Sequence, residues 1–479
     1  MKRWICGGLA VALLAVACDT GSSSRDGGTI GRTPRARPGQ PGRAPLKIGL
    51  VGTMTGPEGW RGEDAFEGAD LGVHHLNRRV GRGERRFELE VLDDGGDGAQ
   101  SLDLLDNLLG RGDTVGIVFA GPPEALVDAE DLLRRAGTPA IIVYGDLYGA
   151  HQLSQGSHIF QATPPHSWQA RDIARYLARD RGYAKVGVMS EAGTFDGSVA
   201  ARAARGALKD YGIGRIVRVT YQADVAAALR RLESKQVEAI VMQGTPSALE
   251  RIYAEIGAMG VRYRGSRAAR IWSLKRKNLR QKRQRTGWWQ PQLVGFDLMI
   301  SDRVKAPPPG SMATGTYARG VHFMPIPSLE RFRNAFEDWW DSPPLGQELR
   351  AYEATMAIGW AVERTDDGGD VARSLEGLRS HRLGGLPVTL GPDDHITVEE
   401  VTIGLWTVPY PSDTHRVEAP KALPWVPLAR GFSIDGETTD VLTADWKWLF
   451  RDPPPRGGPA PRFTKMRFGV ATRRSDPLR

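Results

Sequence analysis

The sequence has few of the groups that carry out enzyme chemistry. Among its 479 residues are two cysteines, Cys6 and Cys18, both close to the N-terminus, so the body of the chain offers no thiol nucleophile. It contains neither a G-x-S-x-G serine elbow nor a G-x-x-x-x-G-K-[ST] phosphate loop. Gly49, Gly52 and Gly56 lack the G-x-G-x-x-G spacing that brings a backbone close to a dinucleotide. We therefore predict a protein that is not an enzyme and binds no cofactor.

Metal-binding patterns are missing as well. The nine histidines are scattered, and His74 and His75 point to different faces of a predicted helix. Asp93, Asp94 and Asp97 in "LDDGGDGAQ" do not have the ligand spacing of an EF-hand calcium loop. A short acceptor before a helix satisfies unpaired backbone N–H groups, so we predict that Asp97 caps the helix that follows. The sequence predicts no metal site.

Acidic residues are missing from one segment. Residues 262–290 hold eleven Lys and Arg and no Asp or Glu, so the segment carries +11 of a formal net charge of +8 and the rest of the chain carries 8 − 11 = −3. A nucleic-acid-binding domain more often spreads its basic residues over a folded face, with readout elements among them. Because the basicity is local and no finger or RRM-like pattern accompanies it, we predict no nucleic-acid partner.

The N-terminus has an apolar run that is too short to span a membrane. Residues 9–17 follow two basic residues, whereas a spanning helix needs about 20 apolar residues. The run ends directly before Cys18 and resembles a bacterial lipoprotein signal, so we predict a signal peptide at 1–17 and lipid attachment at Cys18; a secretory signal cut elsewhere is the alternative. Residues 18–45, rich in Gly, Ser, Pro and Arg, are predicted to be a flexible tether. Either signal predicts a location outside the cytoplasm.

Beyond the tether, short apolar runs alternate with stretches of helical periodicity, such as Ala65, Ala69, Val73 and Leu76. The predicted strands are residues 46–52, 87–93, 114–121, 139–145, 158–163, 185–190, 216–221, 238–244 and 291–297. Strand and helix in repeated alternation favour a parallel sheet covered on both faces. Because the alternation restarts after a Pro-Pro pair at 164–165, we predict two similar Rossmann-like α/β lobes in tandem.

Later segments are too short to form a third domain. A predicted helix at 351–365 and predicted strands at 386–391 and 402–408 are expected to complete the two lobes. Residues 411–479 are rich in proline but include aromatic pieces, and we predict that they form a C-terminal extension over the body.

Four segments, taken in their order along the chain, resemble a known family. "LKIGLVGTMTGPEGWRGEDAFEGADLGVHHLN" is similar to the opening strand and helix of the branched-chain amino-acid (leucine/isoleucine/valine-binding) substrate-binding lipoproteins of ABC transporters, which are type 1 periplasmic binding proteins. "VLDDGGDGAQSLDLLDNLL" resembles the D-D-x-x-D-P-x-x-A segment of that family, with Gly98 in place of the usual proline. "YAKVGVMSEAGTFDGSVAARAARGALKDYG" and "HRLGGLPVTLGPDDH" are similar to two later segments, and the similarity covers residues 46–261 and 291–408.

The resemblance implies a clamshell of two lobes, joined by three crossovers, that closes on a small molecule. By alignment the crossovers are expected near Thr163, Gly320 and Val388. The implied first lobe is 46–163 plus 321–388, and the implied second lobe is 164–320 plus 389–410, with the basic segment as an insertion.

The resemblance also implies ligand contacts in the first lobe. Trp60 occupies the position of an aromatic residue over the ligand. Where the family binds a carboxylate through Ser hydroxyl and backbone N–H groups, this chain has Pro123 and Glu124, and the next pocket loop has Gly145 and Asp146. Prolines at that position remove backbone donors. In the alternative, the prolines open a helix and Glu124 faces solvent.

In the second lobe the implied contacts are Phe195, Thr245 and Asp297. Asp297 aligns with the acidic residue that pairs with a ligand ammonium, and a turn-forming Asp after a strand is the alternative. We therefore expect an amino acid, an amide or a cationic solute as the ligand.

Two functions remain in competition. The first is a transport receptor, held at the membrane by its lipid, that delivers a small molecule to an ABC permease and its ATPase. The second is a ligand-binding sensor or envelope interaction protein, whose basic insertion contacts anionic lipid or polysaccharide with Trp288 and Trp289 at the lipid interface. For the insertion itself, the alternative is a solvated loop without a partner.

Overall fold

The structure is a computed structural model of the chain. It describes residues 44–80, 85–148, 153, 156–222, 224–259, 289, 291–300, 311–315, 327–344, 347–365, 369–384, 387–397, 402–406, 425–427, 441–444 and 463–466. The predicted signal peptide, Cys18, most of the tether and, apart from Trp289, the basic insertion lie outside these residues. Within them, no helix has the length and apolarity that a bilayer crossing requires.

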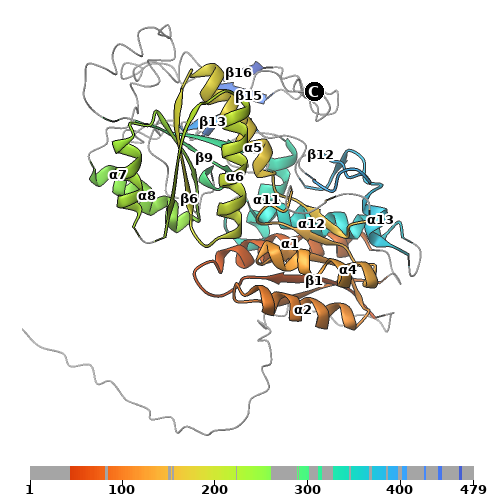
Figure 1. Cartoon of the computed structure of the whole chain (residues 1–479). Helices are drawn as coiled ribbons and strands as arrows, with labels where there is room; N and C mark the ends of the chain where they lie inside the picture. The colour runs from red at the N-terminus through yellow and green to blue at the C-terminus, as the bar shows by residue number, and fades with distance from the viewer. Residues whose placement is uncertain are drawn as a thin grey trace, which may run out of the picture.

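The first lobe is built on a five-stranded parallel sheet with the strand order β2-β1-β3-β4-β5. Its strands are β1 (Leu46–Gly52), β2 (Phe87–Asp93), β3 (Thr114–Ala120), β4 (Ala140–Ile142) and β5 (Ile159–Gln161). Its helices are α1 (Trp60–Arg79), α2 (Gly98–Gly110), α3 (Pro123–Asp128), α4 (Glu130–Ala136), α11 (Pro327–Trp340), α12 (Glu348–Val362) and α13 (Val371–Leu375). Figure 1 shows α1 and α2 on opposite faces of this sheet. Accordingly, Ile48 and Leu50 of β1 pack in the cluster that contains α1 and α12, whereas Val51 packs with α2.

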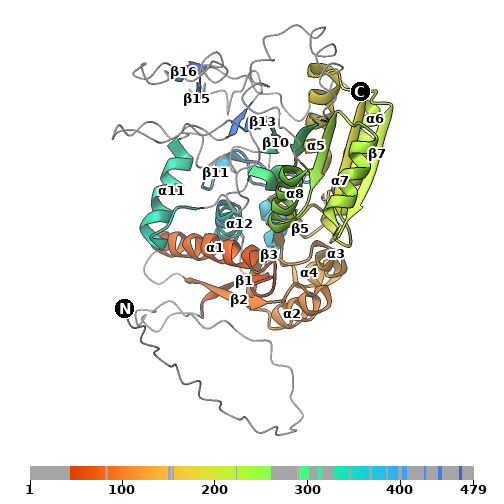
Figure 2. The same ribbon diagram turned by 90° about the vertical axis from the view of Figure 1, so that its left-hand side faces the viewer.

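The second lobe is built on a seven-stranded sheet with the order β14-β13-β10-β9-β8-β6-β7. Its strands are β6 (Lys185–Glu191), β7 (Arg215–Tyr221), β8 (Ala239–Gln243), β9 (Gln292–Gly295), β10 (Met312–Gly315), β13 (Thr402–Trp406) and β14 (Trp425–Pro427). Its helices are α5 (His166–Arg175), extended by a π-helical turn (Tyr176–Asp180), α6 (Phe195–Asp210), α7 (Val225–Ser234), α8 (Pro246–Ala258) and a 3₁₀ turn (Asp297–Ile300). The parallel part, β7-β6-β8-β9-β10, repeats the strand order of the first lobe, which confirms the predicted tandem α/β architecture. Figure 2 shows the first lobe, with α1 and β1, below the second lobe, with α8 and β10.

Residues after Val388, where the alignment implied the third crossover, contact the first lobe. Strand β12 (Pro387–Val388) pairs with β11 (His381–Arg382), and the residues after it run along β5 of the first lobe. The backbone N–H of Gln161 donates to the oxygen of His395 at 2.9 Å, and the N–H of Thr397 donates to the oxygen of Gln161 at 2.9 Å. This pairing places residues 395–397 along the edge of β5, where it satisfies backbone groups that would otherwise be open.

Trp289 is buried and does not lie at a lipid interface, so that part of the sequence interpretation is wrong. Its side chain is 7 % exposed, and its indole N–H donates to the backbone oxygen of Val237 at 2.9 Å. A buried indole N–H needs such an acceptor, which fixes the point where the insertion rejoins the second lobe. Trp288 lies outside the described residues.

The C-terminal extension is described at three short strands. β14 pairs antiparallel with β13 at the edge of the second sheet, and β15 (Val441–Ala444) pairs with β16 (Phe463–Met466). In the first lobe, Asp97 caps α2 as predicted. Its carboxylate accepts the backbone N–H of Ala99 at 2.9 Å.

Candidate functional site

The predicted ligand contacts lie beyond the carboxyl ends of strands in both sheets. They are Trp60 after β1, Pro123 and Glu124 after β3, Gly145 and Asp146 after β4, Phe195 after β6, Thr245 after β8 and Asp297 after β9. Ligands of open α/β sheets bind at this end of the strands. The surroundings of each residue show which of them have side-chain groups that a ligand can reach.

His166 is the centre of a buried charged cluster. It is the first residue of α5, directly after the crossover, and its Nδ1 lies 3.3 Å from Oδ2 of Asp146 and 3.6 Å from Oδ1 of Asp196. The ring of Phe296 packs edge-on against the imidazole, with centroids 5.1 Å apart. Burial alone would lower the pKa of His166, but the carboxylates of Asp196, Asp146 and Asp297 raise it to about 9. The imidazole is therefore protonated at neutral pH.

Asp196 is the carboxylate of this cluster that keeps hydrogen-bonding capacity on one oxygen. It lies in the first turn of α6, and the side-chain amide of Gln243 donates to its Oδ2. Its Oδ1 is buried and accepts no hydrogen bond from the described residues. Burial raises the pKa of Asp196, while the positive charges of His166 and Arg61 act in the opposite direction. Because Arg61 belongs to the first lobe, this electrostatic interaction crosses between the lobes.

Asp146 is fully used by protein donors. Its Oδ2 accepts the backbone N–H of His166 at 2.7 Å, and its Oδ1 accepts the side-chain amide of Gln161 and the backbone N–H of Tyr148, both at 2.9 Å. The residue is 1 % exposed. Asp146 therefore holds the start of α5 against the end of β5 and positions His166.

Asp297 is a third carboxylate within electrostatic reach of His166. It follows β9, is buried, and opens a 3₁₀ turn. Its backbone N–H donates to Oε1 of Gln169 at 2.8 Å, and Nε2 of Gln169 donates to the oxygen of Pro164 at 2.9 Å. Gln169 thus links the residue after β9 of the second lobe to Pro164 at the crossover. The negative charge of Asp297 also helps to raise the pKa of His166.

Two aromatic rings lie on the first-lobe side of the candidate site. Trp60 is the first residue of α1, and its ring meets that of Tyr144 edge-on, with centroids 5.3 Å apart. The hydroxyl of Tyr144 donates to Oδ2 of the buried Asp64 at 2.9 Å. Edge-to-face packing and a satisfied hydroxyl fix both rings in place.

Arg61 supplies the positive charge on that side. Its guanidinium carbon lies 5.7 Å from the ring centroid of Trp60, and its Nη2 pairs with Oε2 of Glu58 at 2.6 Å. Its Nε is buried and donates to no acceptor in the described residues. A buried unpaired donor carries a free-energy cost of roughly 1–3 kcal/mol, so an anionic group arriving there would relieve it.

The loop after β3 differs from the implied carboxylate site. Pro123 is buried in the first turn of α3, with its ring against Gly145, whose φ of +82° suits glycine. Glu124 is exposed in the same turn, where a negative charge complements the helix dipole. The chain therefore follows the alternative in which the prolines open a helix and Glu124 faces solvent.

Phe195 and Thr245 have local partners. Phe195 packs against the first-lobe cluster that includes Phe119 and Leu126, so it joins the two lobes by apolar contact. Thr245 donates through its backbone N–H and its hydroxyl to Oε2 of Glu191, at 3.0 and 3.1 Å, at the start of α8.

Sequence reasoning missed His166, Arg61 and Asp196. Each stands directly beside a residue or pair that was singled out, namely the Pro-Pro pair, Trp60 and Phe195, and each opens a helix at the carboxyl edge of a sheet. Polar residues at that edge are the signal that would have found them. Within the described ranges, no group of three or more His, Cys, Asp or Glu side chains is arranged to hold a metal ion.

Two α/β lobes with charged groups where they meet define a two-lobed α/β protein. A family model described as periplasmic binding protein matches residues 45–407, and the chain belongs to that family. Two curated relatives are the "Leu/Ile/Val-binding protein homolog 3" of Brucella melitensis, 25 % identical over 210 residues, and the "Leu/Ile/Val-binding protein BraC3" of Rhizobium johnstonii, 24 % identical over 207 residues. Each match covers 42 % of this chain and 55 % of the relative, so the chain spans about half the length of these relatives.

Solved structures share the fold. A type 1 periplasmic binding protein from Bordetella pertussis superimposes with a TM-score of 0.61 at 16 % identity, covering 78 % of this chain and 99 % of its own. LivJ from Streptococcus pneumoniae, solved with isoleucine, has a TM-score of 0.57 at 17 % identity and covers 76 % and 96 %. A solute-binding protein from Rhodopseudomonas palustris, solved with 3,4-dihydroxybenzoic acid, has a TM-score of 0.56 at 16 % identity and covers 75 % and 92 %. The fold is therefore the two-lobed fold of type I periplasmic binding proteins.

Proposed function

We propose that this protein is the extracytoplasmic solute-binding lipoprotein of an ABC importer, and that it binds an amino-acid-like small molecule between its lobes. One observation carries the proposal. Arg61 on the first lobe and Asp196 on the second are within electrostatic reach of each other, and each has a buried polar atom without a hydrogen-bond partner in the described residues. Opposite charges on opposite lobes suit a small molecule that carries both signs.

The ligand chemistry follows from these groups. A carboxylate would accept from Nε of Arg61 beside the ring of Trp60, where guanidinium–carboxylate geometry gives strong hydrogen bonds. An ammonium would donate to Oδ1 of Asp196, in a cluster where three carboxylates surround one imidazolium. Because the carboxylates outnumber that imidazolium, a ligand cation lowers the electrostatic cost of burying them.

The relatives support this class of ligand. Two are named as Leu/Ile/Val-binding proteins, and one neighbouring structure holds isoleucine. The same fold also holds an aromatic acid in the Rhodopseudomonas palustris protein. A carboxylate is common to both ligands, and Arg61 is the group that we assign to it.

Closure couples binding to transport. A ligand that touches both lobes stabilises the closed arrangement by the contacts it makes only there, and a permease can then distinguish loaded from empty protein. The proposed lipid on Cys18 would keep the protein at the membrane, with residues 18–45 as the tether. Loss of acyl labelling in Cys18→Ser would support the anchor, whereas unchanged labelling would refute it.

The experiment that tests the proposal is isothermal titration of the purified protein against zwitterionic amino acids, their amides, polyamines and aromatic acids. We expect measurable binding for compounds that carry a carboxylate, and the strongest binding for those that also carry an ammonium. Absence of binding for every compound at millimolar concentration would refute a transport receptor of this ligand class.

A further inference from the structure

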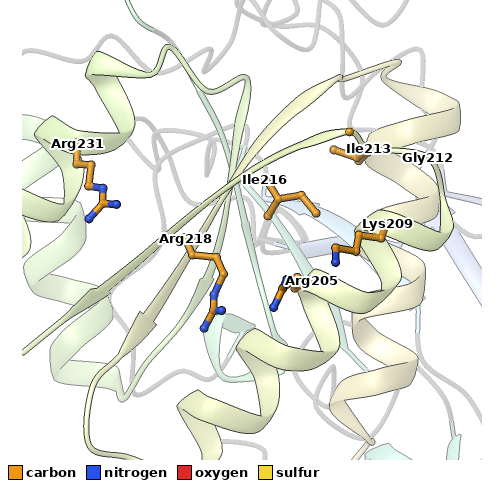
Figure 3. Close-up of a pocket in the computed structure, with 8 residues that line it drawn as sticks. Arg205, Lys209, Gly212, Ile213, Ile216, Arg218 and Arg231 are labelled. Atoms are coloured by element: carbon orange, nitrogen blue, oxygen red, sulfur yellow. The ribbon is translucent and has the colours of Figure 1, made fainter.

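A basic hollow lies on the second lobe, away from the ligand site. It has a volume of about 550 Å³ and is lined by residues of α6, β7 and α7 and of the turn between α6 and β7. The basic lining residues are Arg205, Lys209, Arg218 and Arg231. Figure 3 shows Arg205 and Lys209 on α6, Arg218 on β7 and Arg231 on α7. Strand β7 is at the edge of the second sheet. None of the described residues that line the hollow is acidic.

The four cations are exposed and unpaired. None of them forms an ion pair or a hydrogen bond with another side chain in the part of the chain that the structure describes. Lys209 and Arg231 lie in the last turns of α6 and α7, where a cation complements the helix dipole. Arg205 lies a turn earlier in α6 and Arg218 lies within β7, so the dipoles do not account for these two. Four like charges around one hollow repel each other unless an anion enters it.

The hollow and the ligand site lie at opposite ends of the second lobe. Helices of a parallel sheet run back from the carboxyl ends of the strands to the amino ends, so the last turns of α6 and α7 lie at the amino end. The connection between α8 and β9 starts and finishes at this same end, and the buried Trp289 marks its return beside Val237, just before β8. That connection contains the eleven Lys and Arg of residues 262–290.

We propose that this hollow is a docking site for the phosphate headgroups of an anionic lipid bilayer. The hollow has room for a headgroup, Arg205, Lys209 and Arg218 supply positive charge from α6 and β7, and Arg231 adds to it from α7. Ile213 and Ile216 form the apolar part of the lining. A surface at the amino end of the second sheet binds lipid without obstructing the ligand site at the carboxyl end. Docking there would orient the second lobe on the membrane, in addition to any lipid on Cys18.

The test is co-sedimentation of the full chain with vesicles, with Cys18→Ser in every sample so that no acyl chain contributes. Vesicles of phosphatidylcholine with phosphatidylglycerol are compared with vesicles of phosphatidylcholine alone. We expect binding to the anionic vesicles that weakens as salt rises. The double variant R205Q/R218Q should reduce the partition coefficient roughly tenfold, because each basic residue near an anionic surface contributes substantially to binding.

Two further variants make the result specific. R205K/R218K keeps both charges and should bind like the parent, whereas R134Q/R135Q removes two exposed arginines from α4 of the first lobe and should also leave binding unchanged. Ligand affinity should be equal in all these variants. Unchanged vesicle binding in R205Q/R218Q would overturn the proposal. The cations would then serve only to keep the edge strand β7 from pairing with a strand of another chain. Binding of soluble tripolyphosphate with no preference for anionic vesicles would overturn it as well.

Discussion

Oδ2 of Asp146, in the first lobe, accepts the backbone N–H of His166, the first residue of the second lobe's α5, at 2.7 Å. The same oxygen lies 3.3 Å from the imidazole Nδ1 of His166. One carboxylate thus fixes both the start of the helix and the charged ring at the point where the chain crosses between lobes. Asp146 is therefore a positioning residue, and Asp196 is the carboxylate that we assign to the ligand.

Removal of either charged group assigned to the ligand should weaken ligand binding. We expect Arg61→Gln and Asp196→Asn each to reduce the affinity for the best amino-acid ligand by roughly tenfold to a hundredfold, the range expected for a charge-assisted hydrogen bond. In Arg61→Gln the loss should be larger for ligands with a carboxylate than for their amides. Titration calorimetry of each variant against the acid and the amide measures both effects.

Arg135→Gln serves as the matched control, because Arg135 is exposed on α4 of the first lobe. It should bind like the parent. If Arg61→Gln also binds like the parent, or loses the acid and the amide equally, Arg61 does not contact the ligand carboxylate.

The charged state of His166 predicts a pH-dependent stability. Its pKa is raised to about 9 in the folded protein, against about 6.5 in an unfolded chain. Between these values the folded state holds a proton that the unfolded state has lost, so the free energy of unfolding falls as the pH rises, by about 3 kcal/mol in total. The contribution is complete below the unfolded pKa and is lost as the pH rises through the folded one. Thermal unfolding across this window measures the loss.

His166→Gln should abolish that slope, whereas His381→Gln, at an exposed position on β11, should keep it. The groups that face the imidazole are the carboxylates of Asp146, Asp196 and Asp297 and the ring of Phe296. Burial raises the pKa of Asp172 to about 6, so this carboxyl group titrates below the pH range in which His166 acts. A slope that persists in His166→Gln would assign the effect to another group.

Much of the fold could be predicted because its signals are local. The apolar runs at 46–52 and 87–93 coincide with β1 and β2, and the stripe of Ala65, Ala69 and Val73 is buried on one face of α1. A buried strand or helix face needs apolar residues at a fixed spacing, and the sequence displays that spacing directly.

The candidate site was only partly predictable because its chemistry is decided by neighbours from distant segments. Asp146 follows β4 and Asp196 opens α6, but donors from residues 148, 161 and 166 use both oxygens of the first, whereas Oδ1 of the second accepts no hydrogen bond from the described residues. Nothing within a few residues of either one encodes that difference. The pairing of residues 395–397 was not predictable for the same reason, because their partner is the edge of β5, far earlier in the chain.

The burial of Trp289 can be tested by removing only its donor. Trp289→Phe keeps an aromatic ring but leaves the backbone oxygen of Val237 without the indole N–H, which should lower the free energy of unfolding by about 1–3 kcal/mol. Trp339→Phe is the control, because that side chain is 41 % exposed, and its own bond to Asp70 is accessible to water. Urea unfolding of both variants measures the difference. Equal stability of the two variants would contradict a structural role for Trp289 where the insertion rejoins the lobe.

The close approach of α1 and α12 predicts opposite effects for one substitution at two helical glycines. A Cβ at Gly68 would collide with the backbone oxygen of Glu348 on α12, so Gly68→Ala must push the helices apart and should destabilise the protein by roughly 1–3 kcal/mol. Gly206 lies in α6 with no atom within 4 Å of an added Cβ. There the better helix propensity of alanine should act alone and stabilise the protein by up to about 1 kcal/mol. Urea midpoints that shift in the same direction in both variants would contradict this packing, because helix propensity favours alanine at both sites and only the contact with Glu348 reverses the sign.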